Sequence, residues 1–440
     1  MLLISDPLEK VLIITYYWPP SGGSGVQRWL KFVKYLPSFG WEPVVFTPEN
    51  PSFDIRDESL LKDVSPALDV IHFPIWEPYQ AFQWLTKLTG KKARPADFIS
   101  TGKRSLFQKA ATWIRGNVFI PDARVSWVRP SVTFLEDYLR RNGIRTIITT
   151  GPPHSVHLIG LRLRQRLDNL RWVADFRDPW SEWDLLDTLM LTRWARGRHR
   201  SLERQVLTQA DAVTSIAPFH VRRLEALSGR RVELLTNGFD ETDFQGITHT
   251  RTQRFTIRHM GVVDELRDPR PFMNAVRKAM QENAGLRNHL AIEFIGQVNA
   301  AFVAWVTADD ELNAVTKFVG QLSHQQLLAW YGKTDVMVLV LAYTSIAPGN
   351  LPGKFFEYMA SGNPIFCMGP RNGDAASIID QHHLGIVHER EDEAGMKRSL
   401  LSLFADWKEG KLHSGQPSSG FSRRALTQKL VELLNKLQAS

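Results

Sequence analysis

The feature that most constrains the fold is the alternation, along almost the whole chain, of short apolar runs with stretches of helical spacing. Seven such runs occupy the first part of the chain, at residues 11–15, 44–47, 70–73, 146–149, 172–175, 212–216 and 232–235. Six more follow in the second part, at residues 255–260, 292–295, 316–319, 336–341, 365–367 and 386–388. Continuously apolar strands that alternate with helices are typical of parallel sheets covered on both faces. The sequence therefore predicts an α/β protein with two doubly wound, Rossmann-like parallel sheets.

The length of 440 residues fits two or three domains. We predict an N-terminal domain over residues 1–245, a second domain over 246–420, and a C-terminal helix over 421–440 that crosses back to the first domain. Two such domains facing each other place the carboxyl ends of their strands around a central cleft, where ligands of doubly wound folds bind.

Composition excludes several classes of protein. The single cysteine, Cys367, can form neither an internal disulfide nor a cysteine cluster for zinc or iron–sulfur. No apolar run approaches the about 18 residues of a membrane span, and Asp6 and Glu9 precede the first apolar run, unlike a secretory signal. We expect a cytoplasmic protein without a metal or a bound cofactor.

Most of the net charge of +8 lies in one segment, residues 87–115, where eight basic side chains meet one acid, a net charge of +7. Aromatic residues are interleaved with them, so the segment is predicted to lie on an anionic membrane surface, which would make the protein peripheral on the inner face of the cell membrane. The alternative is a solvated insertion whose aromatic side chains pack onto the domain. A second basic group is Arg193, Arg196, Arg198, Arg200 and Arg204. No nucleic-acid-binding pattern accompanies either group, so nucleic acid is not an expected partner.

Three turns that follow predicted strands of the first domain carry candidate site residues. Gly22 and Gly23 lie between the first strand and a helix, where backbone amides can approach a phosphate; the alternative is a purely structural tight turn. His154 follows two prolines and can bind a sugar hydroxyl, or else cap the next helix. Asp175, Arg177 and Asp178 end a strand, where charges need a ligand or, as the alternative, an internal pair of Arg177 with a carboxylate.

The most informative segment is residues 347–364, in which a glycine-containing loop leads into a short helix. Lys354 and Glu357 are three residues apart and share one face of that helix. A helix N-terminus with Lys354 suits a diphosphate, and Glu357, about one turn deeper, suits two adjacent hydroxyls; a surface Lys–Glu pair is the alternative. Upstream, Gly261 ends a strand and Arg267 offers another cation.

These motifs resemble the GT-B glycosyltransferases, specifically the retaining family four that uses nucleotide sugars. The resemblance covers roughly residues 10–434, and its segments are YYWPPSGGSGVQR, TTGPPHSVHLIG, DFRDPW, TNGFD, HMGVVDELRDPRPF and LPGKFFEYMASGNPI. It implies that the second domain binds the donor and the first domain the acceptor, with retention of configuration and no metal. The family residues that it matches are His154, Lys354, Arg267, Gly22, Gly23 and Glu357. Together with the reading of the motifs above, we predict the catalytic residues His154, Lys354 and Arg267, the donor-binding residues Gly22, Gly23, Gly261, Asn350, Leu351 and Glu357, and the residues Asp175, Arg177 and Asp178 to orient acceptor or sugar.

One position departs from the family pattern, which has two glutamates separated by seven residues. Counting back from Glu357 reaches Gly349, and the surrounding loop has no acid. Either backbone amides replace that contact, or the donor sugar is unusual, or activity is reduced. The function predicted from the sequence is transfer of a sugar from a nucleoside diphosphate sugar to a lipid-linked or cell-envelope polysaccharide precursor. The alternatives are a sugar-nucleotide 2-epimerase of the same architecture and a degenerate protein that binds sugar nucleotides without turnover.

Overall fold

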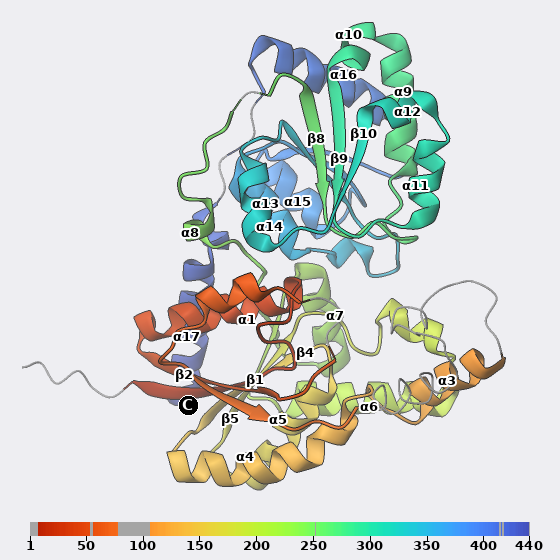
Figure 1. Ribbon diagram of the computed structural model, residues 1–440. Coiled ribbons are helices and arrows are strands. Elements are labelled where there is room, and N and C mark those ends of the chain that lie inside the picture. Colours follow the sequence, from red (N-terminus) through yellow and green to blue (C-terminus); the bar gives the residue numbers. More distant parts are fainter. Residues whose placement is uncertain are drawn as a thin grey trace, which may run out of the picture. The chain divides into compact units, whose positions relative to one another are not determined.

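The computed structural model describes residues 8–52, 56–77, 106–250, 252–412, 415 and 418–439 (Figure 1). The chain divides into two compact units: unit 1 comprises residues 1–236 and 427–440, and unit 2 comprises residues 237–426. The sequence placed the division after residue 245 and the start of the C-terminal helix at residue 421. Most of the basic segment predicted to meet a membrane, residues 87–105, lies outside the described residues.

Unit 1 is built on a sheet of seven strands, all of whose neighbouring pairs are parallel. The order is β3-β2-β1-β4-β5-β6-β7. In chain order the strands are β1 (Glu9–Ile14), β2 (Trp41–Pro48), β3 (Asp69–Phe73), β4 (Thr146–Gly151), β5 (Arg171–Phe176), β6 (Ala212–Ser215) and β7 (Glu233–Leu234). Since β1 has β2 on one side and β4 on the other, the strand order reverses between β1 and β4, where doubly wound sheets open a crevice.

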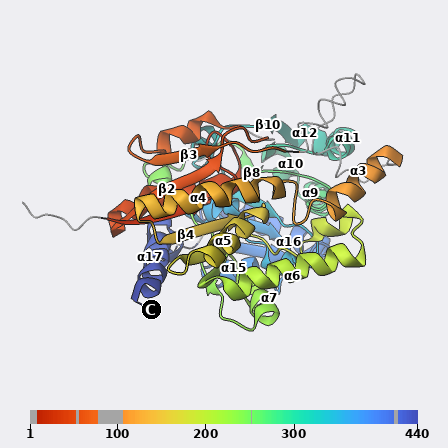
Figure 2. The ribbon, with the colours of Figure 1, turned by 90° about the horizontal axis from the view of Figure 1, so that it is seen from below.

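Helices separate the strands of unit 1, as the 3.6-residue spacing predicts. They are α1 (Ser24–Tyr35), α3 (Leu106–Asn117), α4 (Val128–Asn142), α5 (Ser155–Arg166), α6 (Arg193–Gln209) and α7 (Pro218–Ser228), with short 3-10 helices η1 (Leu36–Phe39), η2 (Glu58–Asp63), η4 (Val125–Trp127) and η5 (Asp184–Leu189). The helices α4, α5 and α6 lie side by side (Figure 2). Their apolar faces and the central strands form one buried core that includes Trp127, Trp172 and Trp180.

Unit 2 repeats this design with six parallel strands in the order β10-β9-β8-β11-β12-β13. The strands are β8 (Phe255–Met260), β9 (Leu290–Ile295), β10 (Thr316–Gly320), β11 (Val336–Val340), β12 (Ile365–Met368) and β13 (Gly385–His388). Its order reverses between β8 and β11. The predicted α/β class with two doubly wound parallel sheets is therefore confirmed.

The helices of unit 2 are α8 (Glu241–Phe244), α9 (Arg270–Glu282), α10 (Ala284–His289), α11 (Ala300–Thr307), α12 (Asp310–Val315), α13 (His324–Tyr331), α14 (Gly353–Ser361), α15 (Asp374–Gln381) and α16 (Glu393–Glu409), with η6 (Ala347–Gly349) and η7 (Ser419–Phe421). The last helix, α17 (Arg423–Ala439), starts in unit 2 and ends in unit 1. In unit 1 it is held by a hydrogen bond of 3.0 Å from Trp41 Nε1 to Asn435 Oδ1. Among the described residues, no helix combines the length and apolar character needed to cross a bilayer.

Candidate active site

In unit 2, a tyrosine of α14 is hydrogen-bonded to the last residue of β8. The Tyr358 hydroxyl accepts a hydrogen bond of 2.8 Å from the Met260 backbone N–H and donates one of 3.1 Å to the Met260 carbonyl. This brings Lys354, on the first turn of α14, to Gly261. A Cβ atom at Gly261 would lie 2.8 Å from Lys354 Nζ, and the Gly261 φ of +137° is one that side chains rarely adopt. Only glycine therefore leaves room for the ammonium at this strand end.

The Lys354 ammonium lies 3.3 Å from Nε2 of His259, which is on β8 itself. The other ring nitrogen, Nδ1, lies 3.0 Å from the Val338 carbonyl, so Nδ1 carries the proton and Nε2 accepts from the lysine. Burial and the Lys354 charge hold the pKa of His259 well below its ordinary value. The lysine thus meets a neutral acceptor, and its charge is left available to an anion.

Two effects lower the pKa of Lys354 to about 7: first burial, and then repulsion from Arg267. Arg267 follows in the loop after β8, is about one third exposed and forms an ion pair of 2.6 Å with Asp264. Asp264 Oδ1 also accepts the backbone N–H of Arg267 at 2.8 Å, which shapes the loop. The structure therefore gathers the two cations that the sequence singled out, close enough to repel each other until an anion binds.

Glu357 lies on the same helix, one turn after Lys354, but its partners come from α13. Glu357 Oε1 is 3.2 Å from His324 Nε2, and Oε2 accepts a hydrogen bond of 2.9 Å from the Tyr331 hydroxyl. These contacts lower the pKa of Glu357 although burial acts in the opposite direction. The carboxylate is thus ionised and held in one orientation, and its remaining lone pairs can accept two further hydrogen bonds.

The loop before α14 provides backbone groups in place of an acid. Gly349 is buried at the end of η6, and Leu351 is buried as well, so only the backbone of Leu351 can serve a ligand. Asn350 is half-buried. No side chain caps the N-terminus of α14, although the Phe355 N–H donates to the Pro352 carbonyl at 3.0 Å. The N–H groups of Gly353 and Lys354 lie before that bond, at the helix start, where no carbonyl one turn earlier is available within the helix. A helix start of this kind attracts phosphate oxygens.

In unit 1, Arg177 links the two turns on either side of the strand reversal. Its guanidinium donates to the Gly25 carbonyl at 2.8 Å, to the Gly151 carbonyl at 3.2 Å and to the Pro152 carbonyl. A Cβ atom at Gly25 would lie 2.9 Å from the guanidinium, so glycine is required there. Of the two glycines named from the sequence, Gly23 caps α1 with a φ of +92°, and Gly22 is half-buried beside it.

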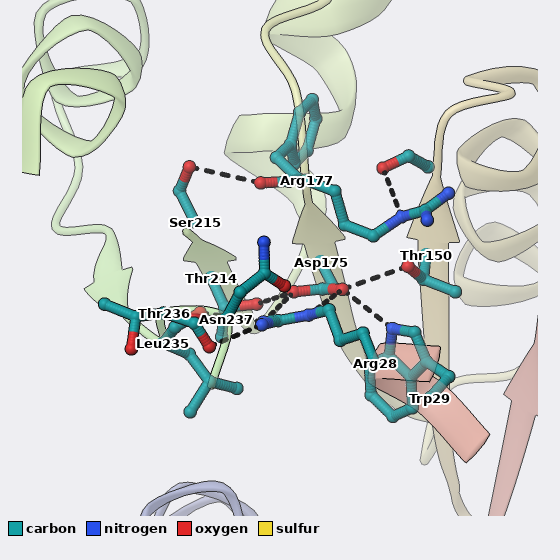
Figure 3. A network of polar contacts seen from close by, with 12 residues as sticks. Arg28, Trp29, Thr150, Asp175, Arg177, Thr214, Ser215, Leu235, Thr236 and Asn237 are labelled. Atoms are coloured by element: carbon teal, nitrogen blue, oxygen red, sulfur yellow. Dashed lines mark hydrogen bonds and ion pairs between the residues drawn. The ribbon is translucent and has the colours of Figure 1, made fainter. Parts of the chain in front are cut away.

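Asp175 is paired with Arg28 rather than with Arg177 (Figure 3). Both side chains are fully buried and their closest atoms are 2.8 Å apart. The carboxylate also accepts hydrogen bonds from Trp29 Nε1, Thr150 Oγ1 and Thr214 Oγ1. The pair with Arg28 holds the pKa of Asp175 below its ordinary value despite burial. An internal pair therefore exists at this strand end, but with a partner that the sequence analysis did not name. Asp178, next along the turn, is half-buried.

His154 is buried after the β4 turn, where the Pro179 backbone is close to its ring but neither ring nitrogen forms a well-aligned hydrogen bond. Its ring stacks on Trp180 at a centroid distance of 5.1 Å and an interplanar angle of 4°. Burial and the nearby His157 hold the pKa of His154 well below its ordinary value, so the imidazole is neutral. Trp180 is held in turn by a hydrogen bond of 3.0 Å to His199 Nδ1. A neutral imidazole can donate to or accept from a hydroxyl.

Several residues of these clusters were missed from the sequence. His259, His324 and Tyr331 in unit 2 and Arg28 in unit 1 received no role. His259 had a signal in the sequence, because a polar residue inside a mainly apolar strand requires a partner. Arg28 had a weaker one, because it is one of several polar residues of its helix. His324 and Tyr331 had none, because their contact with Glu357 depends on how α13 packs beside α14.

Comparison with known proteins places the chain in a class. Sucrose-phosphate synthase from Thermosynechococcus elongatus matches with a TM-score of 0.61 and 15% identity, covering 98% of this chain and 99% of that chain. WaaG, a glycosyltransferase involved in lipopolysaccharide biosynthesis, matches at 0.57 and 13%, covering 96% and 99%. A putative UDP-N-acetylglucosamine 2-epimerase from Listeria monocytogenes matches at 0.56 and 11%, covering 98% and 96%. At these identities the likeness shows the fold, which is GT-B.

Residues 22–238 match the family model of the glycosyl transferase 4-like domain. Unit 1 of the chain therefore contains a glycosyl transferase 4-like domain, and the resemblance drawn from the sequence motifs is confirmed. A search of curated proteins found no match.

Proposed function

We propose that the protein transfers a sugar from a nucleoside diphosphate sugar to a lipid-linked or cell-envelope polysaccharide precursor, with retention of configuration. One observation carries the proposal: Lys354 and Arg267 lie at the uncapped start of α14, one turn from the anchored carboxylate of Glu357. Cations at a helix start suit a diphosphate, and a fixed carboxylate suits the two adjacent hydroxyls of a ribose.

In this mechanism the diphosphate gains negative charge as its bond to the sugar breaks. Lys354, Arg267 and the first-turn amides of α14 stabilise that charge without having to reorganise, which lowers the barrier. The Gly22 and Gly23 amides are assigned to the same diphosphate by the family resemblance. No metal or bound cofactor is needed in this proposal, because the cations are supplied by side chains.

We assign sugar and acceptor recognition to unit 1. The neutral His154 imidazole has no well-aligned hydrogen bond at either ring nitrogen, which suits a hydrogen bond to a sugar hydroxyl. Asp178 is the remaining candidate for orienting hydroxyls, since Asp175 already has donors on both oxygens. The lipid-linked acceptor is consistent with a protein working at the cytoplasmic face of a membrane.

The experiment is a donor screen that measures release of nucleoside diphosphate, with membrane extract as the source of acceptor. Lys354→Ala is expected to lower turnover about 10² to 10³-fold, the usual loss when one charge-stabilising contact is removed. Glu357→Ala should also abolish most transfer, because the donor loses the anchor of its two ribose hydroxyls. The matched controls are Lys317→Ala and Glu409→Ala, which remove an exposed lysine and an exposed glutamate from the same unit and should leave turnover unchanged. Near-normal turnover in both site variants would refute the assignment.

Two alternatives give different outcomes in the same screen. The structural likeness to a putative 2-epimerase favours testing UDP-N-acetylglucosamine without acceptor, because epimerisation needs none. A degenerate protein, for which the glycine at 349 is the argument, would bind a sugar nucleotide and release no nucleoside diphosphate with any acceptor.

A further inference from the structure

We propose that unit 1 docks on an anionic lipid bilayer through a surface formed by α3, the turn at residues 189–192 and the exposed face of α6. We call it the α3–α6 surface. The inference deepens the proposed function, because a lipid-linked acceptor lies in a bilayer, but binding to vesicles can be measured without donor or acceptor. It rests on described residues and does not depend on residues 78–105.

Large apolar side chains are exposed together on this surface. Trp194 is 70% exposed, Val118 61%, Met190 47%, Ile114 45% and Trp113 43%. Two of them come from α3, one from just after it, and two from the start of α6 and the turn before it. A cluster of exposed aromatic and aliphatic side chains is rare on a surface that faces only water.

The two segments are held side by side by the Asn117 side chain at the end of α3. Asn117 Nδ2 donates to the Met190 carbonyl at 3.2 Å, and Asn117 Oδ1 accepts from the Thr192 backbone N–H at 2.8 Å. Gly116 lies so close to this turn that a Cβ atom would be 2.6 Å from the Leu189 carbonyl oxygen. The exposed apolar side chains therefore belong to one continuous region of unit 1.

Met190 adds a second observation. It adopts a left-handed backbone conformation with a φ of 55°, which residues with side chains adopt rarely and at an energetic cost. The turn nevertheless leaves an apolar side chain about half exposed to solvent. The left-handed conformation ends η5 at Met190, and it leaves the exposed side chain as part of the apolar cluster.

Cations outnumber acids around the apolar cluster, where the exposed Asp187 is paired with Arg196 of α6 at 2.9 Å. The helix α6 buries Ala195, His199, Leu202 and Val206 and exposes Arg193, Arg198, Arg200 and Arg204. Its single acid, Glu203, is buried and accepts the backbone N–H groups of Trp180 and Ser181. The helix α3 contains no acid and exposes Lys109. Cations around aromatic and aliphatic side chains are the pattern of a surface that inserts at the headgroup level.

The test is co-sedimentation of the full chain with vesicles of phosphatidylcholine alone and of phosphatidylcholine mixed with phosphatidylglycerol. The variant Arg198→Ser/Arg200→Ser should lower partitioning onto the mixed vesicles about tenfold to thirtyfold, and Val118→Ser/Trp194→Ser about tenfold. The matched controls are Arg140→Ser/Arg141→Ser on α4 and Leu61→Ser on η2, which remove exposed side chains of the same kinds from elsewhere on unit 1. Thermal melting of each variant verifies its fold.

The outcomes distinguish docking through the α3–α6 surface from self-association and from binding elsewhere on unit 1. Unchanged binding of both α3–α6 variants overturns the proposal, as does an equal loss in the controls. If the protein sediments without vesicles, and Val118→Ser/Trp194→Ser abolishes that sedimentation, the surface mediates self-association and the proposal is overturned. If binding to the mixed vesicles does not depend on salt concentration, the role of the arginines is overturned. Vesicle binding is measured without donor or acceptor. A negative result in that experiment therefore does not contradict the proposed sugar transfer, and a negative transfer assay does not contradict docking through the α3–α6 surface.

Discussion

The two units have the same architecture at the point where the strand order reverses, but they treat the cation that lies there differently. In unit 1 the turns after β1 and β4 are bridged by Arg177, which is buried and donates to three backbone carbonyls. In unit 2 the turns after β8 and β11 meet at Lys354, which is half-buried, bonded to a neutral histidine and repelled by Arg267. The first cation connects two turns, and the second is the one to which the proposed function assigns an anion.

Charges at strand ends can be structural or ligand-binding, and we assign one example of each kind to the two units. Asp175 and Arg177 looked like site residues because a charge at the end of an apolar strand must be compensated. The structure gives each of them several partners within unit 1. Lys354 and Arg267 occupy the equivalent region of unit 2 with fewer compensating contacts. The number of internal partners, rather than the presence of charge, distinguishes a structural network from a ligand site.

The strongest test of this comparison removes the buried pair of unit 1. Arg28→Met leaves the Asp175 carboxylate buried without its counterion, and breaking such a pair costs about 3–5 kcal/mol of unfolding free energy. Urea denaturation measures this loss. The exposed pair of Arg141 with Asp137 provides the control, because Arg141→Met should cost less than about 1 kcal/mol.

A second variant decides whether charge is the cause. Asp175→Asn added to Arg28→Met removes the orphaned charge but keeps an oxygen acceptor for Thr150, Thr214 or Trp29, so part of the lost stability should return. If Arg28→Met alone costs no more than the control does, Asp175 is not a structural residue, and its assignment to acceptor binding regains support.

How much of this was predictable from the sequence depends on the range of the interaction. Apolar runs located the strands of both sheets, because burial on both faces leaves a local signature; residues 255–260 coincide with β8, whereas the last strand of unit 1 is shorter than predicted. The positions of Lys354 and Glu357 on one helix followed from their spacing. The partner of Asp175 did not, since Arg28 is far from it in sequence and meets it only when α1 packs beside β5.

The second prediction concerns the pH dependence of donor binding. In the free protein Lys354 has a pKa of about 7, and a bound diphosphate will raise that pKa by attraction. Below pH about 7 the lysine is protonated before and after binding, so affinity is constant there. Above it, binding must take up a proton, so the affinity for a nucleoside diphosphate sugar should fall up to about tenfold per pH unit. Calorimetry in buffers of different ionisation enthalpy counts the proton directly.

The control for this prediction is Lys354→Met, which cannot titrate. Its affinity should be lower at neutral pH and should no longer depend on pH in this range. A wild-type affinity that stays constant from slightly acidic to alkaline pH would contradict the assignment of Lys354 to the diphosphate. Lys354 would then be a structural cation, as Arg177 is in unit 1.

The smallest expected effect concerns His154, where unit 1 does leave a polar group without a well-aligned hydrogen bond. Trp180→Phe keeps a ring for His154 to stack on but removes the hydrogen bond to His199. If His154 only fills the core, the variant should lose about 1 kcal/mol of stability and keep its kinetic constants. If His154 binds a sugar hydroxyl, a looser stack should also lower kcat a few-fold, with little change in the KM for the donor, whose binding we assign to unit 2. Steady-state kinetics beside urea denaturation tell these apart, and a change in kcat would show that both units, not unit 2 alone, present ligand-binding groups beside their strand reversals.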